Sequence, residues 1–338
     1  MGALRRLTIG LVTLCMALSL AGCAAPKLTL DPEELYALPE LPERYTALNQ
    51  QLSAIQEGGA EYATPVSGSN IQPVQMMDLD GDGREEALAF FRQSDGEKPL
   101  KIYIFAADGD SYRQVAVIEG SGLAIYSVAY SDMNGDGKME IIVGWRVSME
   151  LQALTVYTLE KDGIRELARS DYVKYAVADL DGDGQRELTV LRADETGAGT
   201  ADCYLWKNGT LTLGSSIRVS MTMAELSQQG RITVGVLRSS TPALFVTGVA
   251  DSTRAITDVL VLRGGELTNL VLSAMTGVSG ESSRFCTLYP TDINGDGVTE
   301  VPRTVPLSGD EESTASQRID WISYDASGLA AKALSTYH

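Results

Sequence analysis

The chain has 338 residues, of which 27 are basic and 45 acidic, so its formal net charge is −18. Its composition, 44% apolar and 21% charged, is that of a globular protein with one large domain or two ordinary ones, and the acidic balance argues against nucleic acid as a partner. The only histidine is His338, which nearly excludes a Ser-His-Asp or Cys-His mechanism and a histidine-ligated zinc site.

The first residues form a targeting signal rather than part of a fold. Two arginines are followed by a mostly apolar stretch, residues 7–20, which is shorter than the ~20 residues that span a bilayer. This stretch leads into Leu-Ala-Gly-Cys, ending at Cys23, which resembles the lipobox of bacterial lipoproteins. The resemblance implies a signal peptide over residues 1–22, a lipidated Cys23 and a tether over residues 23–40. An ordinary secretory signal is the alternative, and both interpretations export the protein.

Acylation of Cys23 would make a membrane the first partner of the chain. Covalent lipid attaches an otherwise soluble domain to a bilayer surface. We therefore expect the protein on the outer face of a bacterial cell membrane, or at an outer membrane. The sequence does not distinguish these two envelopes.

The next segment, residues 41–70, is expected to contain a short helix and a connector. Proline at position 42 suits a first helical turn, and Gly58-Gly59 suits the end of the helix. Apolar residues recur with helical spacing on one face, at Tyr45, Leu48, Leu52 and Ile55. We expect this helix to pack on the main domain. A lid or a partner-binding helix is the alternative.

The remaining residues, 71–338, repeat one loop pattern four times. Each copy has acidic or amide side chains at positions 1, 3, 5 and 9 and glycine at positions 4 and 6. The interval before the last copy is about twice the others, and a degenerate copy without acidic residues lies between them, near Val236. The four complete copies start at Asp78, Asp132, Asp179 and Asp292.

A second marker, a tight turn between two strand-like runs, recurs in phase with these loops. Asn-Gly and Asp-Gly between alternating apolar runs are strong hairpin signals. The turns lie at Asp108-Gly109, Asp162-Gly163, Asn208-Gly209, Gly264-Gly265 and, less tightly, at residues 325–328.

Together the two markers predict units of four strands. The first unit has strands at residues 74–79, 87–92, 101–106 and 113–118, and the last at residues 286–290, 301–307, 318–324 and 329–335. A four-stranded repeat of about 50 residues is typical of a propeller blade. We therefore predict an all-β fold, a β-propeller of five four-stranded blades over residues 71–338. Six or seven blades would require a decayed blade in the N-terminal region.

Two smaller features belong to the same region. Thr222 and Glu225 have the spacing of a capping box, and Gly230 suits a helix end, so we expect one short inter-blade helix. Cys203 and Cys286 lie in apolar strand-like runs, which favours buried free thiols, with a disulfide as the alternative.

The four acidic loops have the composition of calcium sites. Carboxylates at positions 1, 3 and 5 can converge on one ion, a carbonyl at position 7 adds a ligand, and an acid at position 9 completes the set. Several hard oxygen ligands suit Ca²⁺ better than Mg²⁺, which prefers fewer protein ligands. The loop is not an EF-hand, because position 12 of the first copy is Ala89 and the flanks are strand-like. We expect about four calcium ions, bound most tightly by the first and third loops.

These loops resemble the Asp-x-Asp-x-Asp-Gly-x-x-Asp/Glu calcium motif of FG-GAP and VCBS-type propeller repeats, the family that includes the integrin α-subunit propeller. The Phe-Gly and Gly-Ala-Pro elements that name the family are not intact, so the resemblance implies the fold and the ion more than adhesion. It implies these metal ligands: Asp78, Asp80, Asp82, Arg84 (carbonyl) and Glu86; Asp132, Asn134, Asp136, Lys138 (carbonyl) and Glu140; Asp179, Asp181, Asp183, Gln185 (carbonyl) and Glu187; Asp292, Asn294, Asp296, Val298 (carbonyl) and Glu300.

The function predicted from the sequence is a membrane-anchored binding or adhesion module for a protein or a glycan, with calcium as a structural element. Propellers gather their loops on two end faces, where binding residues commonly lie. A scaffold or assembly component of the cell envelope is the first alternative. A glycosidase or lyase that uses paired carboxylates is the second, but the conspicuous acids belong to the loops, so we do not expect an enzyme.

Overall fold

The structure is a computed structural model, and it describes residues 45–337 apart from 95, 110, 228, 250, 272–280, 285–287 and 307–316. The predicted signal peptide, Cys23, the tether and Cys286 lie outside the described residues. Within the described part of the chain, no helix is long and apolar enough to cross a membrane.

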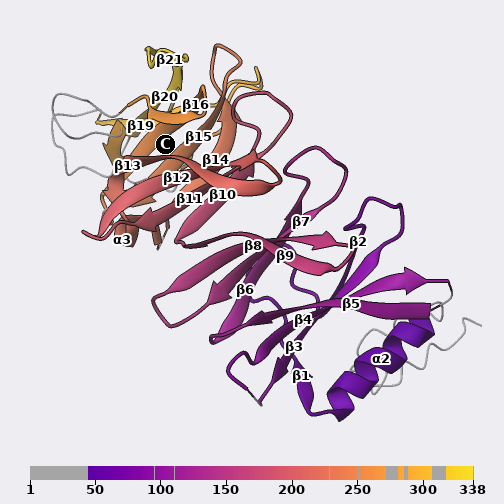
Figure 1. The fold of residues 1–338 in the computed structure, drawn as a ribbon. Helices are drawn as coiled ribbons and strands as arrows, with labels where there is room; N and C mark the ends of the chain where they lie inside the picture. The colour runs from indigo at the N-terminus through magenta and orange to yellow at the C-terminus, as the bar shows by residue number, and fades with distance from the viewer. Residues whose placement is uncertain are drawn as a thin grey trace, which may run out of the picture. The chain divides into compact units, whose positions relative to one another are not determined.

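The expected N-terminal helix is present as α2 (Thr46–Glu57), the indigo helix of Figure 1. Its apolar face buries Leu48 and Leu52. The side chain of Gln51 donates a hydrogen bond to the carbonyl of Tyr112 in the first sheet. The helix ends before Gly59, which has a φ of +91°. It therefore packs on the first sheet, as predicted.

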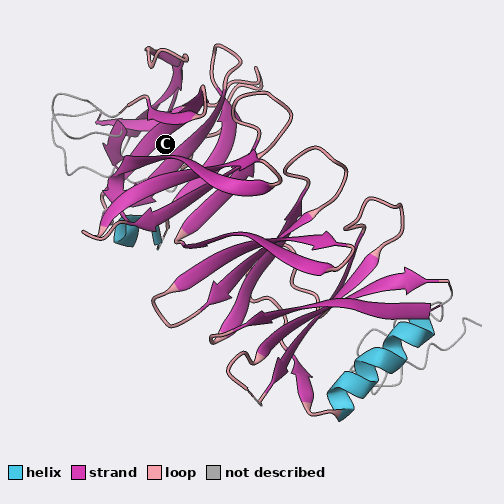
Figure 2. Cartoon of the chain, in the orientation of Figure 1, coloured by secondary structure: helices cyan, strands magenta, loops and turns pink. Residues whose placement is uncertain are grey.

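Most of the described chain forms five antiparallel sheets that follow one another in sequence (Figure 2). The first contains β1 (Ala60–Tyr62), β2 (Val74–Met77), β3 (Glu86–Gln93), β4 (Leu100–Asp108) and β5 (Ser111–Gly120). The second contains β6 (Ala124–Ser131), β7 (Glu140–Arg146), β8 (Gln152–Glu160) and β9 (Gly163–Asp171). The third contains β10 (Lys174–Ala178), β11 (Glu187–Ala193), β12 (Ala198–Lys207) and β13 (Thr210–Thr222).

The last two sheets complete the series. The fourth contains β14 (Arg231–Val236), β15 (Pro242–Val249), β16 (Arg254–Arg263), β17 (Glu266–Asn269) and β18 (Glu281–Arg284). The fifth contains β19 (Val301–Pro306), β20 (Gln317–Tyr324) and β21 (Ala330–Tyr337). The predicted all-β fold of four-stranded, propeller-like blades is confirmed, and the described sheets do not close into a ring.

Three details of the sheets differ from the prediction. Strand β1, from the segment expected to be a connector, pairs with β3 beside β2. The fourth strand of the fourth sheet is divided, because β17 and β18 both pair with β16. The first strand expected in the last sheet is reduced, in the described residues, to a single bridge between Thr291 and Glu300. Pairing across the sheet, rather than local pattern, decides all three.

In the first, second and fourth sheets, the strands β3, β7 and β15 are nearly continuous apolar runs because both of their faces are covered. In β3 the first six residues are all buried, and β7 and β15 have the same pattern. The fourth strands, such as β5, have exposed and buried positions mixed along their length. An apolar run therefore marks a strand whose two faces are both covered.

The apolar core is divided into clusters that lie between consecutive sheets. One cluster joins the first and second sheets around Phe90 and Trp145, and another joins the second and third around Val156 and Leu188. Two further clusters join the third to the fourth sheet and the fourth to the fifth. Each sheet thus buries apolar surface by stacking on its neighbours, which is the physical requirement of a repeat architecture.

The predicted connections are also present. Asn208 and Gly209, with φ of +53° and +76°, form the hairpin turn between β12 and β13. The inter-blade helix is α3 (Met223–Ser227). Its capping box is formed in both directions, since the Thr222 amide donates to Glu225 and the Glu225 amide donates to the Thr222 hydroxyl. Cys203 is a buried free thiol in β12.

Candidate metal centre

The acidic loops occupy the same place in four of the five units. The first, second and third loops (residues 78–86, 132–140 and 179–187) connect β2 to β3, β6 to β7 and β10 to β11, and the fourth (residues 292–300) leads into β19. In all four, the final glutamate lies where the second strand begins and is at most 3% exposed. The other acidic positions lie in the turn before it.

In each loop the aspartate at position 1 organises the turn. In the first loop, Asp78 accepts hydrogen bonds from the amides of Gly81 and Gly83 at 2.8 and 2.9 Å. The other three loops repeat these two bonds at 2.7–3.0 Å. Both glycines have positive φ, which a residue without a Cβ adopts readily. The backbone amides therefore hold the position-1 carboxylate in one orientation.

The glutamate at position 9 is held by the residue at position 2. The amide of Leu79 donates to Glu86 Oε2 at 2.8 Å, and the equivalent bonds to Glu140, Glu187 and Glu300 measure 2.9, 2.8 and 3.2 Å. Because this carboxylate is anchored at the start of a strand, it reaches from the sheet into the loop that precedes it.

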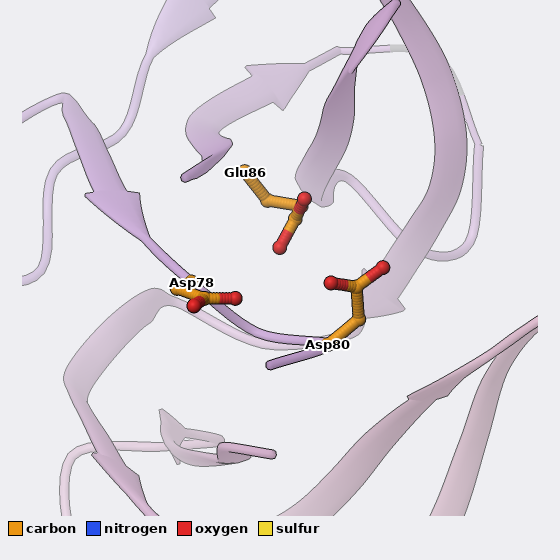
Figure 3. Close-up of side chains that lie close together, drawn as sticks. All are labelled: Asp78, Asp80 and Glu86. Atoms are coloured by element: carbon orange, nitrogen blue, oxygen red, sulfur yellow. The ribbon is translucent and has the colours of Figure 1, made fainter. Parts of the chain in front are cut away.

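Three carboxylates converge in the first loop. One oxygen from each of Asp78, Asp80 and Glu86 lies within 4.8 Å of the others, and Figure 3 shows the three groups facing a common space. Asp179, Asp181 and Glu187 form the same cluster in the third loop. These are positions 1, 3 and 9 of the motif, and either group of acids could hold a metal ion.

The second and fourth loops differ at position 3, where Asn134 and Asn294 replace aspartate. Each amide group donates to the position-5 aspartate, Asp136 or Asp296, at 3.1 and 2.9 Å. These loops offer one carboxylate fewer. The sequence-based expectation that the first and third loops bind most tightly stays a prediction.

The position-5 aspartates lie outside the carboxylate clusters. Asp82 accepts a hydrogen bond from the Arg84 amide at 2.8 Å and pairs with the Arg84 guanidinium at 2.9 Å, which lowers the pKa of Asp82. Asp183 accepts from the amide of Gln185 at 2.7 Å. Positions 1, 3 and 9 are thus brought together, whereas position 5 is directed to the residue two places further along.

The electrostatics of the loops favour a bound cation. Burial, reinforced by the neighbouring aspartates, raises the pKa of Glu86 and Glu300 and raises those of Glu140 and Glu187 to about 7. Glu300 also has a buried oxygen, Oε1, without a hydrogen-bond partner in the described structure. A buried, unpaired carboxylate oxygen is unfavourable, and a divalent cation would supply its partner. The donor set therefore fits a metal ion.

The degenerate unit has a short turn instead of a loop, residues 237–241. The Leu237 amide donates to the carbonyl of Thr241 at 2.9 Å, and Ser240 has a φ of +57°. The amide of Arg238 donates to the carbonyl of Tyr324 in β20 at 2.9 Å. We refer to this segment as the acid-free turn. It bonds to its own chain and to the last sheet.

Sequence reasoning missed a second group of acids, which lie inside the sheets. Asp202, Asp258 and Asp320 lie in β12, β16 and β20, one in each of the last three sheets, and are at most 9% exposed. Each accepts a hydrogen bond from a serine hydroxyl, at 2.5–2.6 Å. Nothing in the local sequence distinguishes them from exposed strand positions, because their partners come from other strands.

One segment of the chain matches a known family of repeats. A model described as FG-GAP-like repeat matches residues 78–143, which include the first and second loops. The fold and the loops define an all-β, propeller-type repeat protein. Within it, the matched segment carries an FG-GAP-like repeat. The comparison with curated proteins found no match.

Solved structures resemble the chain at low identity. A rhamnogalacturonan lyase from Bacillus licheniformis is 12% identical over 78% of this chain and 66% of its own, with a TM-score of 0.38. A protein from Lactobacillus plantarum is 11% identical over 80% and 86% of the two chains, with a TM-score of 0.37. A hypothetical selenium-binding protein from Sulfolobus tokodaii is 10% identical over 66% and 58%, with a TM-score of 0.36.

Proposed function

We propose that this protein is an exported, lipid-anchored binding module whose acidic loops hold calcium. The observation that carries the proposal is the recurring loop geometry. Carboxylates at positions 1, 3 and 9 converge in the first and third loops, and the buried position-9 glutamate accepts the position-2 amide in all four. Oxygen ligands in this number suit Ca²⁺. The FG-GAP-like repeat over residues 78–143 supports a propeller-type binding module.

Calcium is proposed as a structural ion rather than a reactant. An ion that binds only the folded chain stabilises it by mass action, by about 1.4 kcal/mol per site at ten times Kd. Extracellular modules typically bind calcium with Kd of about 10⁻⁴–10⁻³ M, so sites of this class fill outside a cell. The ion would neutralise carboxylates that otherwise repel one another.

Thermal unfolding tests the calcium part of the proposal. We expect millimolar calcium to raise the melting temperature by several degrees over excess chelator, and by more than millimolar magnesium does. Equal melting temperatures in all three conditions would contradict it, and the loops would then be turns stabilised only by their own hydrogen bonds.

The anchor is tested separately. Cells that express the protein and are fed a labelled fatty acid should incorporate the label into the wild-type chain and not into Cys23→Ser. Export without label would favour the ordinary secretory signal.

The end of the second sheet opposite its acidic loop favours a protein as the ligand. There, a turn after β7 exposes Met149 (87%) and Leu151, and the β5–β6 connection exposes Leu123 (51%). The Leu123 amide donates to the carbonyl of Arg146 at 2.7 Å, which holds the two connections together. Exposed apolar side chains gathered on one end are typical of protein-binding surfaces.

The same observation favours the second candidate, an assembly component of the cell envelope that recognises its own machinery. Cross-linking in intact cells distinguishes the two candidates. Partners that are envelope proteins of the same cell, lost in Met149→Asp, would favour assembly. Retention of every cross-link in Met149→Asp would contradict a role for this surface.

A further inference from the structure

Neighbouring acidic loops are hydrogen-bonded to one another in series. The Met139 amide, at position 8 of the second loop, donates to the carbonyl of Leu79, at position 2 of the first, at 3.0 Å. The Arg186 amide in the third loop donates in the same way to Met133 in the second, at 2.8 Å. The same motif positions form both bonds. The first three loops therefore make one continuous row.

Each bond links backbone groups that are directly connected to predicted metal ligands of two different loops. The Leu79 amide donates to Glu86 Oε2, while the Leu79 carbonyl accepts from Met139. The Met139 amide belongs to the same peptide unit as the Lys138 carbonyl, which is the predicted position-7 ligand of the second loop. A single residue and a single peptide unit thus separate a ligand of the first loop from a ligand of the second.

The connection is repeated between the second and third loops. The Met133 amide donates to Glu140 at 2.9 Å, and the Met133 carbonyl accepts from Arg186. The peptide unit of that amide carries the carbonyl of Gln185, the predicted ligand of the third loop. The backbones also approach closely, because a Cβ on Gly81 would lie 2.8 Å from the carbonyl oxygen of Gly137.

The fourth loop has a different neighbour. Its Thr299 amide donates to the carbonyl of Val236 at 2.9 Å, and the Val236 amide donates to the Thr299 hydroxyl at 3.3 Å. Val236 is followed by the acid-free turn, whose residues 237–241 include no carboxylate. The same kind of bond therefore connects the fourth loop to a segment without acidic ligands.

We propose that the first three loops bind their cations with positive coupling, whereas the fourth loop binds alone. The inference rests on the proposed function, because it concerns how the same sites fill. A cation on a carbonyl polarises that peptide unit and strengthens the bond its amide donates, since hydrogen bonds in a chain reinforce one another. Ordering one loop also holds the backbone that the next loop must order to bind.

Glycine-selective ¹⁵N labelling of the full chain gives one reporter for each loop. The position-6 glycine amides each donate to their position-1 aspartate, at 2.8–3.0 Å, so their resonances respond to what the aspartate binds. A calcium titration then yields a separate midpoint for every loop, at Gly83, Gly137, Gly184 and Gly297.

The decisive variants remove the position-3 side chain of one loop at a time. Asp80→Ala in the first loop should raise the calcium midpoint at Gly137 about fivefold or more, the lower end of typical coupling between sites, and leave Gly297 within about twofold. The matched control, Asn294→Ala in the fourth loop, should leave the first three reporters within about twofold. Equal midpoints at Gly137 in the wild type and Asp80→Ala would overturn the coupling.

A second pair of variants tests the contact without removing a ligand. Gly81→Ala and Gly295→Ala both occupy position 4, with φ of +73° and +78°, so both strain their own loop. Only the first places a Cβ against the neighbouring loop, and a Cβ on Gly295 meets nothing within 4 Å. We expect Gly81→Ala to raise the midpoint at Gly137 and Gly295→Ala to leave all three reporters of the row unchanged. Identical effects on the row from both variants would contradict the proposal.

The titration separates this inference from the proposed function. Four reporters that shift with calcium but keep independent midpoints in every variant would overturn the coupling and leave the calcium sites standing. A wild-type chain in which none of the four reporters responds to calcium would overturn both.

Discussion

The third acidic loop and the acid-free turn make the same kind of connection between strands, but with different hydrogen-bond partners. Both connect the first and second strands of a blade-like sheet. The loop directs its amides at carboxylates, as Gly182 and Gly184 do at Asp179. The turn directs its amides at carbonyls, within itself and on the last sheet.

This difference teaches that the blade does not need the acids in order to fold. In the third loop, burial and the neighbouring aspartates raise the pKa of Glu187 to about 7, so keeping this carboxylate charged opposes folding, yet the acid-free turn joins its strands with no carboxylate at all. The loops therefore carry an electrostatic cost that the turn avoids. A bound cation is the physical reason that would make such a cluster favourable.

Removing one carboxylate from the third loop should have the largest effect on this comparison. Asp181→Ala, which removes a member of the converging cluster, should lower the number of bound ions from about four to three and destabilise the protein by about 1.4 kcal/mol in calcium at ten times Kd. With chelator present the loss should be small. Unfolding monitored in both conditions, together with calorimetric ion counting, measures it. The same loss with and without chelator would show that Asp181 acts only through the hydrogen bond it accepts from the Asp183 amide.

Removing the side chain that holds the acid-free turn should have a smaller effect, and one that does not depend on calcium. Arg238 donates to the carbonyl of Leu329 and lies 3.9 Å from Asp325. Arg238→Ala should cost about 1 kcal/mol, because one hydrogen bond and a weak, partly exposed ion pair are lost. Chemical unfolding at high calcium and in chelator should give equal losses. A loss that appears only with calcium would show that the turn is coupled to a metal site.

The loops should also make stability depend on pH in the absence of calcium. Burial raises the pKa of Glu140 and Glu187 from 4.5 to about 7, so the folded chain binds more protons than the unfolded chain between these values. The free energy of unfolding should therefore fall as pH rises from about 4.5 to about 7. Melting curves in chelator from pH 5 to pH 8 test the direction.

Calcium should counteract that decline, because it binds the deprotonated carboxylates and its stabilisation grows with pH. The double variant Glu140→Gln, Glu187→Gln is the control, and it should lose most of the slope seen in chelator. A slope that persists in this variant would assign the effect to other groups.

The smallest effect is expected at Ser239 in the acid-free turn. Its hydroxyl accepts a hydrogen bond from the Ala326 amide at 3.0 Å on the surface. Ser239→Ala should change stability by no more than about 0.5 kcal/mol and leave the ion count unchanged. A drop from four ions to three would mean that the degenerate unit binds metal after all.

The sequence predicted the repeating units well because their markers are local. Glycine with positive φ at Gly81 or Gly209 is needed wherever the backbone turns in that way, so the loops and hairpins are visible in the chain itself. The capping box of α3 is local for the same reason. That the loops bind an ion, and that the ion is calcium, stays a prediction.

The features that sequence reasoning missed depend on residues far apart in the chain. Strand β1 forms because it pairs with β3, where Ala60 lies opposite Gln93. Asp258 is buried because Ser220, from the preceding sheet, satisfies both of its oxygens. Asp82 was expected beside the other carboxylates, but the guanidinium of Arg84 holds one of its oxygens. No periodic pattern in the amino-acid sequence accompanies any of these contacts.

The sequence by itself determined the number of units, the order of strand, loop and hairpin in each, and the positions of the acids, because turns and alternating strands are set by residues within a few positions of one another. Only the tertiary structure decided which carboxylates converge and which loops touch. The Met139–Leu79 bond exists because the first two sheets stack and bring their loops together. Stacking is driven by apolar burial between sheets, which no single repeat can achieve alone.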